Sequence, residues 1–238
     1  MPIICLRDVA KCHHRGQVST IALDGVTLTV AGGEYLGVFG PSGSGKSTLL
    51  NVMAGLEVPD RGAVEVLGVD LCARTADERA RLRRRRIGVV YQSFNLLPSL
   101  TLAENVVLPL LLDGWSRERA ETRAISALRE VGLHARLDHR PCQISGGEAQ
   151  RAAIARALVI EPRLILADEP TGNLDSAQGD AMLRMLRELG SDRGGAVVVA
   201  THDPQAVKWC DRIIELRDGR VVVPQADDPC RRQTWATG

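Results

Sequence analysis

The sequence predicts an α/β fold with a parallel sheet, an antiparallel β region near its start and a helical insertion. Two strand-like segments, at 26–30 and 63–67, have connections too short for helical crossovers, which indicates antiparallel pairing. Residues 98–158 show a helical pattern, which indicates a separate helical lobe of about residues 95–158. Apolar runs typical of buried strands lie at residues 35–39, 87–91, 164–167 and 196–200.

A glycine-rich loop follows the first of the buried strands. The segment 26–30 alternates as a strand does and ends at Ala-Gly-Gly, and 35–39 is the next strand. Residues 40–48 then read Gly-Pro-Ser-Gly-Ser-Gly-Lys-Ser-Thr, which fills every fixed position of G-x-x-x-x-G-K-[ST]. A helix is expected at 47–54. A Gly/Ser linker that matched the motif by chance would lack this strand and helix.

This loop has the residue types that bind a nucleotide phosphate. Glycines let successive backbone N–H groups point inward at an anion. Lys46 is expected to reach the β- and γ-phosphates, and the Ser47 hydroxyl is expected to help hold Mg²⁺. The predicted phosphate-binding residues are therefore Gly40, Pro41, Ser42, Gly43, Ser44, Gly45, Lys46, Ser47 and Thr48.

Arginine is dense at residues 79–86, directly before the strand at 87–91. A nucleic-acid patch would explain this density, but no aromatic or basic cluster follows it. The net charge of the 238-residue chain is only +1. A solvated helix end is the better interpretation, and no nucleic-acid partner is expected.

One helix of the helical lobe can be placed by its ends. Ser116 is a suitable N-cap, and Gly132 ends the run. Between them, apolar residues recur at helical spacing, at Ala120, Ala124, Ala127, Leu128 and Val131.

Two carboxylates end the strand at 164–167. Parallel strands deliver their last residues to the sheet edge where the sites of α/β proteins lie. Asp168 is expected to face Mg²⁺, and Glu169 is expected to polarise an attacking water. A solvated acidic turn is the alternative, and a complete phosphate loop in the same chain disfavours it.

The chain after these carboxylates returns to a strand rhythm. A helix is expected at about 177–189 and a strand at 196–200. A hairpin of strands 213–216 and 221–223 is expected around an Asp-Gly turn. Residues 224–238 are expected to form a polar C-terminal tail.

A second pair of glycines opens the helix that follows residue 145. Ser145 as N-cap and Glu148 reaching back would form a capping box. The intervening Gly146 and Gly147 cost the helix roughly 1 kcal/mol each relative to alanine. A cap alone does not need them, whereas glycines allow a phosphate to approach the helix N-terminus, which favours anions.

With these motifs in order, the chain resembles the ATP-binding cassette (ABC) ATPases over about residues 3–223. Ile144-Ser-Gly-Gly-Glu148 fits the signature motif of that family, Leu-Ser-Gly-Gly-Gln/Glu. Gln92 fits the Q-loop, Asn173-Leu-Asp175 fits the D-loop, and His202 fits the switch histidine. The resemblance implies a P-loop NTPase (RecA-like) core with an N-terminal antiparallel β subdomain and an inserted α-helical signature subdomain. The nucleotide-binding domain would span residues 1–223.

The family resemblance also implies the chemistry, with ATP and Mg²⁺ as cofactors. Two cassettes would form a head-to-tail dimer, and ATP would lie between the phosphate loop of one and the signature residues of the other. Glu169 would be the general base, His202 would hold the γ-phosphate and the base in register, and Gln92 would sense Mg²⁺. The implied catalytic set is Glu169, His202, Gln92 and Lys46, and the metal set is Ser47, Gln92 and Asp168. The nucleotide-binding set adds Ser145, Gly146, Gly147, Glu148 and Asp175.

A finer resemblance points to the lipoprotein-releasing and macrolide-efflux branch. It rests on four segments, at residues 94–98, 102–106, 108–111 and 167–175. It implies an ATPase subunit on the cytoplasmic face of the inner membrane, powering a permease that docks near Phe94–Leu100. Phe94, Leu96, Leu97 and Leu100 form either this docking patch or part of the lobe interior.

Other functions stay open or fit less well. A regulatory cassette of the cell-division type, which drives cell-wall remodelling without moving a solute, is the alternative. Paired soluble cassettes of translation or repair are disfavoured because this chain has one cassette and no sustained heptads. A small-molecule kinase would not need the helix start at Ser145.

Two departures from the family pattern stand out. The family places an aromatic near residue 12 to stack on adenine, whereas this chain reads Lys11-Cys12-His13-His14. Either His13 or His14 supplies a weaker ring or the stacking is lost, and each His is alternatively a solvated loop residue. Because stacking on a base is worth about 1–3 kcal/mol, weakened nucleotide affinity is expected. Ala149 stands where the family often has Gln, with a small expected effect.

The composition indicates the compartment. The longest apolar runs are too short for a bilayer span, which needs about 20 residues, and the N-terminus lacks a signal-peptide layout. The six cysteines form no C-x-x-C pair, so free, mostly buried thiols in a reducing compartment are expected.

Overall fold

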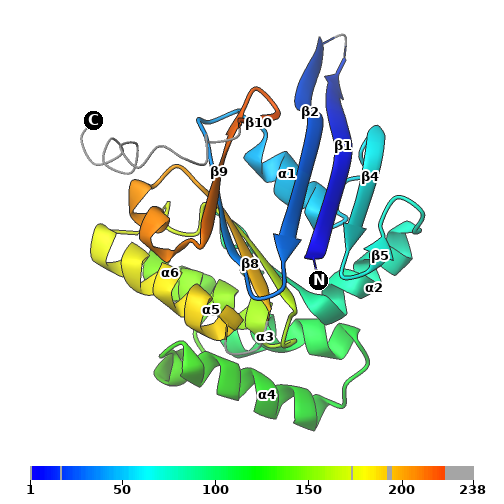
Figure 1. The fold of residues 1–238 in the computed structure, drawn as a ribbon. Coiled ribbons are helices and arrows are strands. Elements are labelled where there is room, and N and C mark those ends of the chain that lie inside the picture. Colours follow the sequence, from blue (N-terminus) through cyan, green and yellow to red (C-terminus); the bar gives the residue numbers. More distant parts are fainter. Residues whose placement is uncertain (1, 17, 173, 192–194, 223–238) are drawn as a thin grey trace.

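The computed structural model describes residues 2–16, 18–172, 174–191 and 195–222, so Asn173 and the expected tail at 224–238 lie outside the described residues. A six-stranded sheet forms the centre, with helices on both faces (Figure 1). Its strand order is β10-β9-β3-β8-β7-β6, and all neighbouring pairs are parallel except β10 with β9. The strands are β3 Tyr35–Phe39, β6 Ile87–Val90, β7 Leu164–Asp168, β8 Ala196–Thr201, β9 Arg212–Arg217 and β10 Arg220–Val222.

The predicted parallel strands are therefore confirmed. β3 and β8 are buried along their whole length because apolar residues face helices or the second sheet on both sides. The Asp-Gly turn between β9 and β10 is also confirmed, since Asp218 and Gly219 both have positive φ, at 49° and 74°.

A smaller antiparallel sheet has the order β2-β1-β4-β5. Its strands are β1 Pro2–Arg15, β2 Val18–Ala31, β4 Arg61–Val66 and β5 Val69–Asp70. The antiparallel character of this sheet is confirmed, but the two segments expected at 26–30 and 63–67 do not pair with each other. β2 is also much longer than the expected 26–30. β1, where no strand was expected, lies between β2 and β4 and pairs antiparallel with both. A bulge explains the omission: Asp8 lies at φ 50° and the register shifts between Leu6 and Val9, so the period-two pattern breaks.

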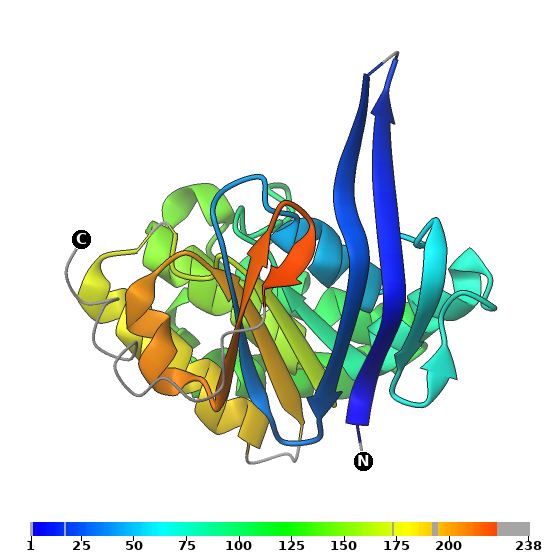
Figure 2. The same cartoon turned by 45° about the horizontal axis from the view of Figure 1, so that its top comes forward.

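The long β1–β2 hairpin projects beyond the rest of the molecule (Figure 2). His13 and His14 lie on β1 within this hairpin, so the interpretation of either as a loop residue is wrong. They pair with Thr20 and Ser19 of β2.

Six helices accompany the sheets in the described chain. They are α1 Lys46–Met53, α2 Ala76–Arg86, α3 Leu102–Leu112, α4 Arg117–Glu130, α5 Gly146–Leu158 and α6 Ser176–Ser191. Short 3₁₀ turns occur at His134–Arg136, Pro141–Gln143 and Pro204–Trp209. One apolar core joins the central sheet to α3–α6, and a second joins it to α1 and the antiparallel sheet.

The helical insertion is confirmed as three helices rather than one continuous pattern. α5 packs against α3 and α4 and also against β6, so it links the insertion to the central sheet. The predicted N-cap position of Ser116 before α4 is confirmed, although its side chain makes no capping hydrogen bond. Full capping boxes instead begin α2, α3 and α5, at Thr75, Thr101 and Ser145.

The arginine-rich segment is a helix end, as predicted, but its cations have structural partners. Arg79 and Arg83 donate to carbonyl oxygens at the C-terminal end of α1, including Gly55. Arg84 donates to the carbonyl oxygen of Leu112, and Arg85 forms an ion pair of 2.7 Å with Asp113. These arginines stabilise helix C-termini, where cations are favoured.

Cysteine burial differs from the expectation. The described free cysteines are not mostly buried, because Cys72 and Cys142 are exposed and Cys5, Cys12 and Cys210 are partly exposed. Within the described residues, no helix combines the length and apolar character needed to cross a membrane.

Candidate functional site

The glycine loop connects β3 to the N-terminus of α1. Gly45 is the N-cap of α1 at φ 103°, and a Cβ there would lie 2.2 Å from the carbonyl oxygen of Ala22 in β2. A Cβ on Gly40 would lie 2.1 Å from the carbonyl oxygen of Leu216 in β9. Only glycine therefore lets the loop pass between these two strands.

Lys46 is the first residue of α1, directly after the glycine turn, and its side chain is only 8% exposed. Its Nζ donates to the carbonyl oxygens of Gly40 at 2.7 Å and Pro41 at 3.0 Å. The same Nζ lies 3.8 Å from Oε1 of Glu169. The structure thus brings the predicted phosphate-binding lysine and the predicted base together, although they are far apart in the sequence.

Asp168 lies beside Ser47, at the end of β7. Burial raises the pKa of Asp168, and the charge of Glu169 adds to this, while a hydrogen bond from Ser47 and the charge of Lys46 lower it. Its Oδ1 is buried without a hydrogen-bond partner. A buried, partnerless carboxylate oxygen next to a hydroxyl fits a hard cation.

A cation at this oxygen would need further ligands from a bound molecule or from water. In the described residues, no group of three or more His, Cys, Asp or Glu side chains could hold a metal by itself. Mg²⁺ commonly takes only one or two protein carboxylates and completes its shell with phosphates and water. Gln92, the third predicted ligand, is exposed just after β6, and a Cβ on Gly172 would lie 3.5 Å from its Nε2.

Three consecutive residues contact Glu169. They are Ala200 and Thr201 at the end of β8 and His202 directly after it. The backbone N–H of Glu169 donates to the carbonyl oxygen of Ala200 at 2.8 Å. Thr201 Oγ1 donates to Oε2 at 3.3 Å, and His202 Nδ1 lies 2.9 Å from Oε1. Glu169 also has φ 44°, a left-handed conformation that costs a non-glycine residue about 1–3 kcal/mol. Such strain at a buried carboxylate is typical of functional sites.

A cavity of about 300 Å³ opens beside this carboxylate. Its lining includes Glu169, Gly172 and His202. His202 is 69% exposed in its side chain, so its ring is accessible to a ligand from this cavity. Thr201, which contacts the same carboxylate, was not predicted, because a single polar residue at the end of an apolar strand matches no motif.

The start of α5 has the predicted capping box. Glu148 N–H donates to Ser145 Oγ at 3.3 Å, and Ser145 N–H donates to Glu148 Oε2 at 2.9 Å. The backbone N–H of Ser145 is the main cause that lowers the pKa of Glu148 to about 2, followed by a hydrogen bond from Arg136. The helix start therefore carries an ionised Glu148 side chain, which pairs with Arg136 at 3.0 Å.

Packing against a neighbouring side chain also favours a glycine at position 147, in addition to the predicted approach of a phosphate. A Cβ there would lie 2.5 Å from Gln178 Oε1. Gln178 in turn donates from its backbone N–H and from Nε2 to the Asp175 carboxylate, at 2.8 and 2.7 Å. Asp175 therefore caps the start of α6. Gln178 connects it to the second phosphate-binding motif, because the Gln178 side chain contacts Asp175 and also packs against Gly147. Sequence reasoning missed Gln178, which belongs to no motif.

The two predicted phosphate-binding motifs do not meet within one chain. In the part of the chain that the structure describes, no hydrogen bond or ion pair joins residues 145–148 to residues 40–48. The glycine loop at 40–48 contacts Glu169 through Lys46. The helix start at 145–148 instead packs against Gln178, which binds Asp175. Within the described residues, the two motifs therefore have different neighbours and share no direct contact.

Of the two histidines considered for adenine, only His13 reaches the loop. Its Nε2 lies 3.2 Å from Thr48 Oγ1 and 3.6 Å from Glu57 Oε2. His14 instead contacts Ser19 at 2.8 Å, and the Cys12 backbone N–H donates to Asp60. The ring that stands beside the phosphate loop is therefore that of His13.

The segment after Gln92 divides between interior and surface. Leu96 packs against the apolar core, whereas Leu97 is 45% exposed. Arg156 donates to the carbonyl oxygens of Phe94 and Asn95, which both have positive φ. The predicted docking patch is thus only partly a surface, with Leu97 as its exposed apolar member.

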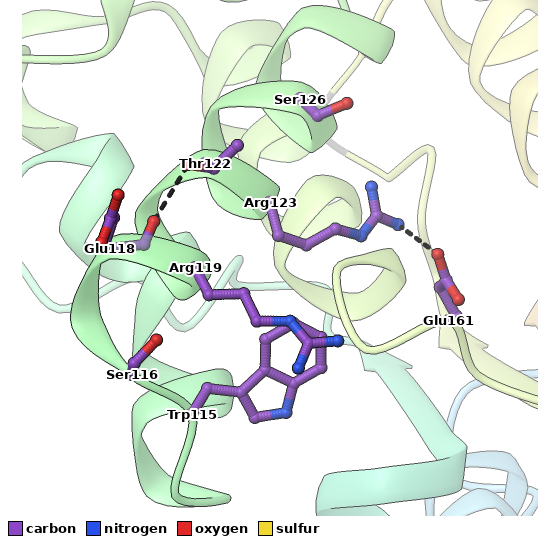
Figure 3. Close-up of a pocket in the computed structure, with 8 residues that line it drawn as sticks. All are labelled: Trp115, Ser116, Glu118, Arg119, Thr122, Arg123, Ser126 and Glu161. Atoms are coloured by element: carbon purple, nitrogen blue, oxygen red, sulfur yellow. Dashed lines mark hydrogen bonds and ion pairs between the residues drawn. The ribbon is translucent and has the colours of Figure 1, made fainter.

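A larger cavity, of about 620 Å³, lies between α4 and Glu161 and contains none of the predicted site residues (Figure 3). Arg119 stacks over the Trp115 ring at 4.4 Å, and Arg123 pairs with Glu161 at 3.2 Å. Its cations and carboxylates largely pair with the protein itself. It is therefore not the nucleotide site.

Comparison with known proteins agrees with this geometry. A family model described as ABC transporter matches residues 23–172. The lipoprotein-releasing system ATP-binding protein LolD of Anaeromyxobacter dehalogenans (strain 2CP-C) is 48% identical over 235 residues, covering 97% of this chain and 96% of that protein. LolD of Shewanella frigidimarina (strain NCIMB 400) is 45% identical and covers 95% of both chains.

A longer relative and a solved structure complete the comparison. The macrolide export ATP-binding/permease protein MacB of Brucella melitensis biotype 1 (strain ATCC 23456 / CCUG 17765 / NCTC 10094 / 16M) is 44% identical over 93% of this chain, which spans only 34% of MacB. The dimeric structure of a post-hydrolysis state of the ATP-binding cassette MJ0796, bound to ADP and Pi, superposes with a TM-score of 0.87. It is 41% identical and covers 92% of this chain and 97% of that chain.

Proposed function

The chain belongs to the ABC transporter family, and from this premise we propose that it is the ATP-hydrolysing subunit of a lipoprotein-releasing type of complex, acting on a membrane permease. As a member of the family it is an ATPase with a P-loop core. The observation that carries the proposal is the Glu169 carboxylate, held between Lys46 of the glycine loop and His202 after β8.

In this proposal the catalytic residues position and stabilise rather than form covalent bonds. The loop amides and Lys46 bind the β- and γ-phosphates of ATP, and Glu169 accepts the proton of the attacking water. His202 lies 2.9 Å from the base and holds it against the γ-phosphate. Phosphoryl transfer depends mainly on such positioning and charge stabilisation.

Ser47, Asp168 and Gln92 would hold Mg²⁺ on the phosphates. Bound there, Mg²⁺ neutralises charge that develops on the phosphate oxygens. The Ser47–Asp168 hydrogen bond and the partnerless Asp168 Oδ1 support this assignment.

A second copy of the chain would complete the site. Ser145 and Gly147 of one cassette would contact the γ-phosphate bound to the loop of the other, so that ATP bridges the two chains. Closure is then linked to ATP binding, and hydrolysis removes the bridge. The separation of the two motifs within one chain and the dimeric state of the MJ0796 cassette support this arrangement.

Lipoprotein release is the favoured role because LolD relatives match this chain over nearly their whole length, whereas it spans about a third of MacB. The alternative, a cassette of the cell-division type, is less well supported, because none of the relatives given above has that name. The cassette would lie peripherally on the cytoplasmic face of the inner membrane, bound to its permease through the segment Phe94–Leu100.

The test of the chemistry is Glu169→Gln. This variant is expected to bind ATP, to accumulate as a closed dimer and to release phosphate at a rate far below that of the wild type. Phosphate release and gel filtration with ATP measure both effects. Glu65→Gln, an exposed position on β4, is the matched control and should behave as wild type. Wild-type turnover by Glu169→Gln would remove Glu169 from the role of base.

The test of docking is Leu97→Asp. It should abolish co-purification with the permease while the ATPase activity of the isolated cassette persists. Leu112→Asp is the matched control, since Leu112 is 59% exposed and lies at the opposite end of α3. Normal co-purification of Leu97→Asp, or equal loss in both variants, would exclude docking at this segment.

A further inference from the structure

Thr201 has an unusual position for a hydroxyl residue, because it is completely buried and still contacts the site. It is the last residue of β8, and its exposed fraction is 0%. Its Oγ1 lies 3.3 Å from Glu169 Oε2 and 3.0 Å from the backbone nitrogen of Asp203. Both polar contacts of this hydroxyl are therefore made within the protein.

The chemistry of these two contacts fixes the direction of the hydrogen bonds. A backbone N–H can only donate, so Asp203 must use a lone pair of the Thr201 oxygen. The single hydroxyl proton is then directed to Glu169 Oε2. An ionised carboxylate only accepts hydrogen bonds, and here each of its oxygens has its own partner, Thr201 on Oε2 and His202 on Oε1.

We propose that Thr201 is a positioning residue for the hydrolytic reaction, fixing the rotation of the Glu169 carboxylate so that Oε1 faces His202 and the ATP site. The hydrogen bond to Oε2 is long, so its strength alone is modest. Its effect comes from geometry, since a carboxylate held on both oxygens cannot rotate away from the attacking water. This inference rests on the proposed role of Glu169 as general base.

The same hydroxyl also joins the base to the switch histidine. By accepting the Asp203 N–H it fixes the turn in which His202 lies, between β8 and the 3₁₀ turn Pro204–Trp209. One buried oxygen thus sets the position of the carboxylate and of the ring that contacts it. Because buried β-branched side chains have few rotamers, threonine holds this oxygen more firmly than serine would.

The experiment compares Thr201→Val with Thr201→Ser in the full-length cassette. Valine keeps the shape and removes the hydroxyl, and kcat is expected to fall about 10-fold. The KM for ATP and the Kd for ATP measured by fluorescence should stay within about twofold, because Thr201 does not touch the phosphate loop. Serine restores the hydroxyl, and kcat should return to within about threefold of wild type.

Two further variants separate positioning from folding. Thr27→Val removes a hydroxyl that also accepts a backbone N–H, from Asp8, but that lies on β2 away from the carboxylate, so its kcat should be unchanged. In a Glu169→Gln background, Thr201→Val should lower the residual rate much less than 10-fold, because residues that act through one another are not additive.

The outcomes are distinct. Wild-type kcat in Thr201→Val, equal defects in the valine and serine variants, or a full 10-fold loss in the Glu169→Gln background would each overturn the positioning role. If Thr201→Val lost both thermal stability and ATP binding, the positioning role would also be overturned, and Thr201 would have a structural role. If Glu169→Gln itself turns over as wild type, the base assignment fails instead, so the two failures can be told apart.

Discussion

Asn105 offers a quantitative test of how the segment after the Q-loop is held. Its side chain is 1% exposed and lies on α3. Oδ1 accepts from the Leu97 N–H at 2.7 Å. The two protons of Nδ2 are shared among the carbonyl oxygens of Leu97, Leu100 and Thr101, which lie at 3.1, 3.3 and 2.9 Å. One amide therefore closes the loop that presents Leu97.

The cost of Asn105→Ala follows from these four contacts, which amount to about three full hydrogen bonds because Nδ2 has two protons. A buried hydrogen bond contributes about 0.5–1.5 kcal/mol net. The two at Leu97 count at the low end because that residue is exposed and its backbone can bond to water, and Thr101 keeps the backbone bond from Asn105 N–H. The expected loss is about 2–3 kcal/mol in the free energy of unfolding. At about 2–4 °C per kcal/mol for a chain of this size, Tm should fall by about 4–12 °C.

Thermal and urea unfolding measure this loss. An unchanged m-value would show that the variant and the wild type expose the same surface on unfolding. Asn51→Ala is the matched control, because Nδ2 of Asn51 makes one side-chain hydrogen bond, of 2.9 Å to Glu57, and its loss should cost about 1 kcal/mol. If Asn105→Ala were no less stable than Asn51→Ala, this account of the Asn105 hydrogen bonds would be refuted.

Three further predictions concern the site. Asp168→Asn should raise the Tm measured without nucleotide at pH 7, because burial raises the pKa of Asp168 and its charge destabilises the fold above that pKa. This gain in Tm should vanish below the ordinary pKa of 3.8. The same variant should weaken Mg²⁺-dependent ATP binding. Glu148→Gln should be less stable than wild type at pH 7, and the difference in urea unfolding should shrink as the pH falls from about 4.5 toward 2, since the pKa of Glu148 is lowered to about 2; a constant difference would contradict this. His13→Tyr should lower the Kd for ATP at least about fivefold in calorimetry, because stacking on a base is worth about 1–3 kcal/mol, and an unchanged Kd would exclude this position from contact with the base.

Features that depend on neighbours in the chain were predictable. The capping box at Ser145 and Glu148 needs only residues three apart, and the glycine loop needs only its own nine residues and the strand and helix beside it. The strand that precedes the two carboxylates was also predictable from its run of apolar residues. β1 was not, because a bulge near Asp8 interrupts the alternation on which strand prediction depends.

The sequence by itself therefore determined the class of fold, the phosphate loop and the identity of the two carboxylates, because these follow from local backbone requirements. Only the tertiary structure decided which residues surround them. Glu169 meets Thr201 and His202 from 32 and 33 residues away, and His13 meets Thr48 from 35 residues away. Such contacts depend on the order of strands in the sheet and on the bend of a hairpin, which no local pattern encodes.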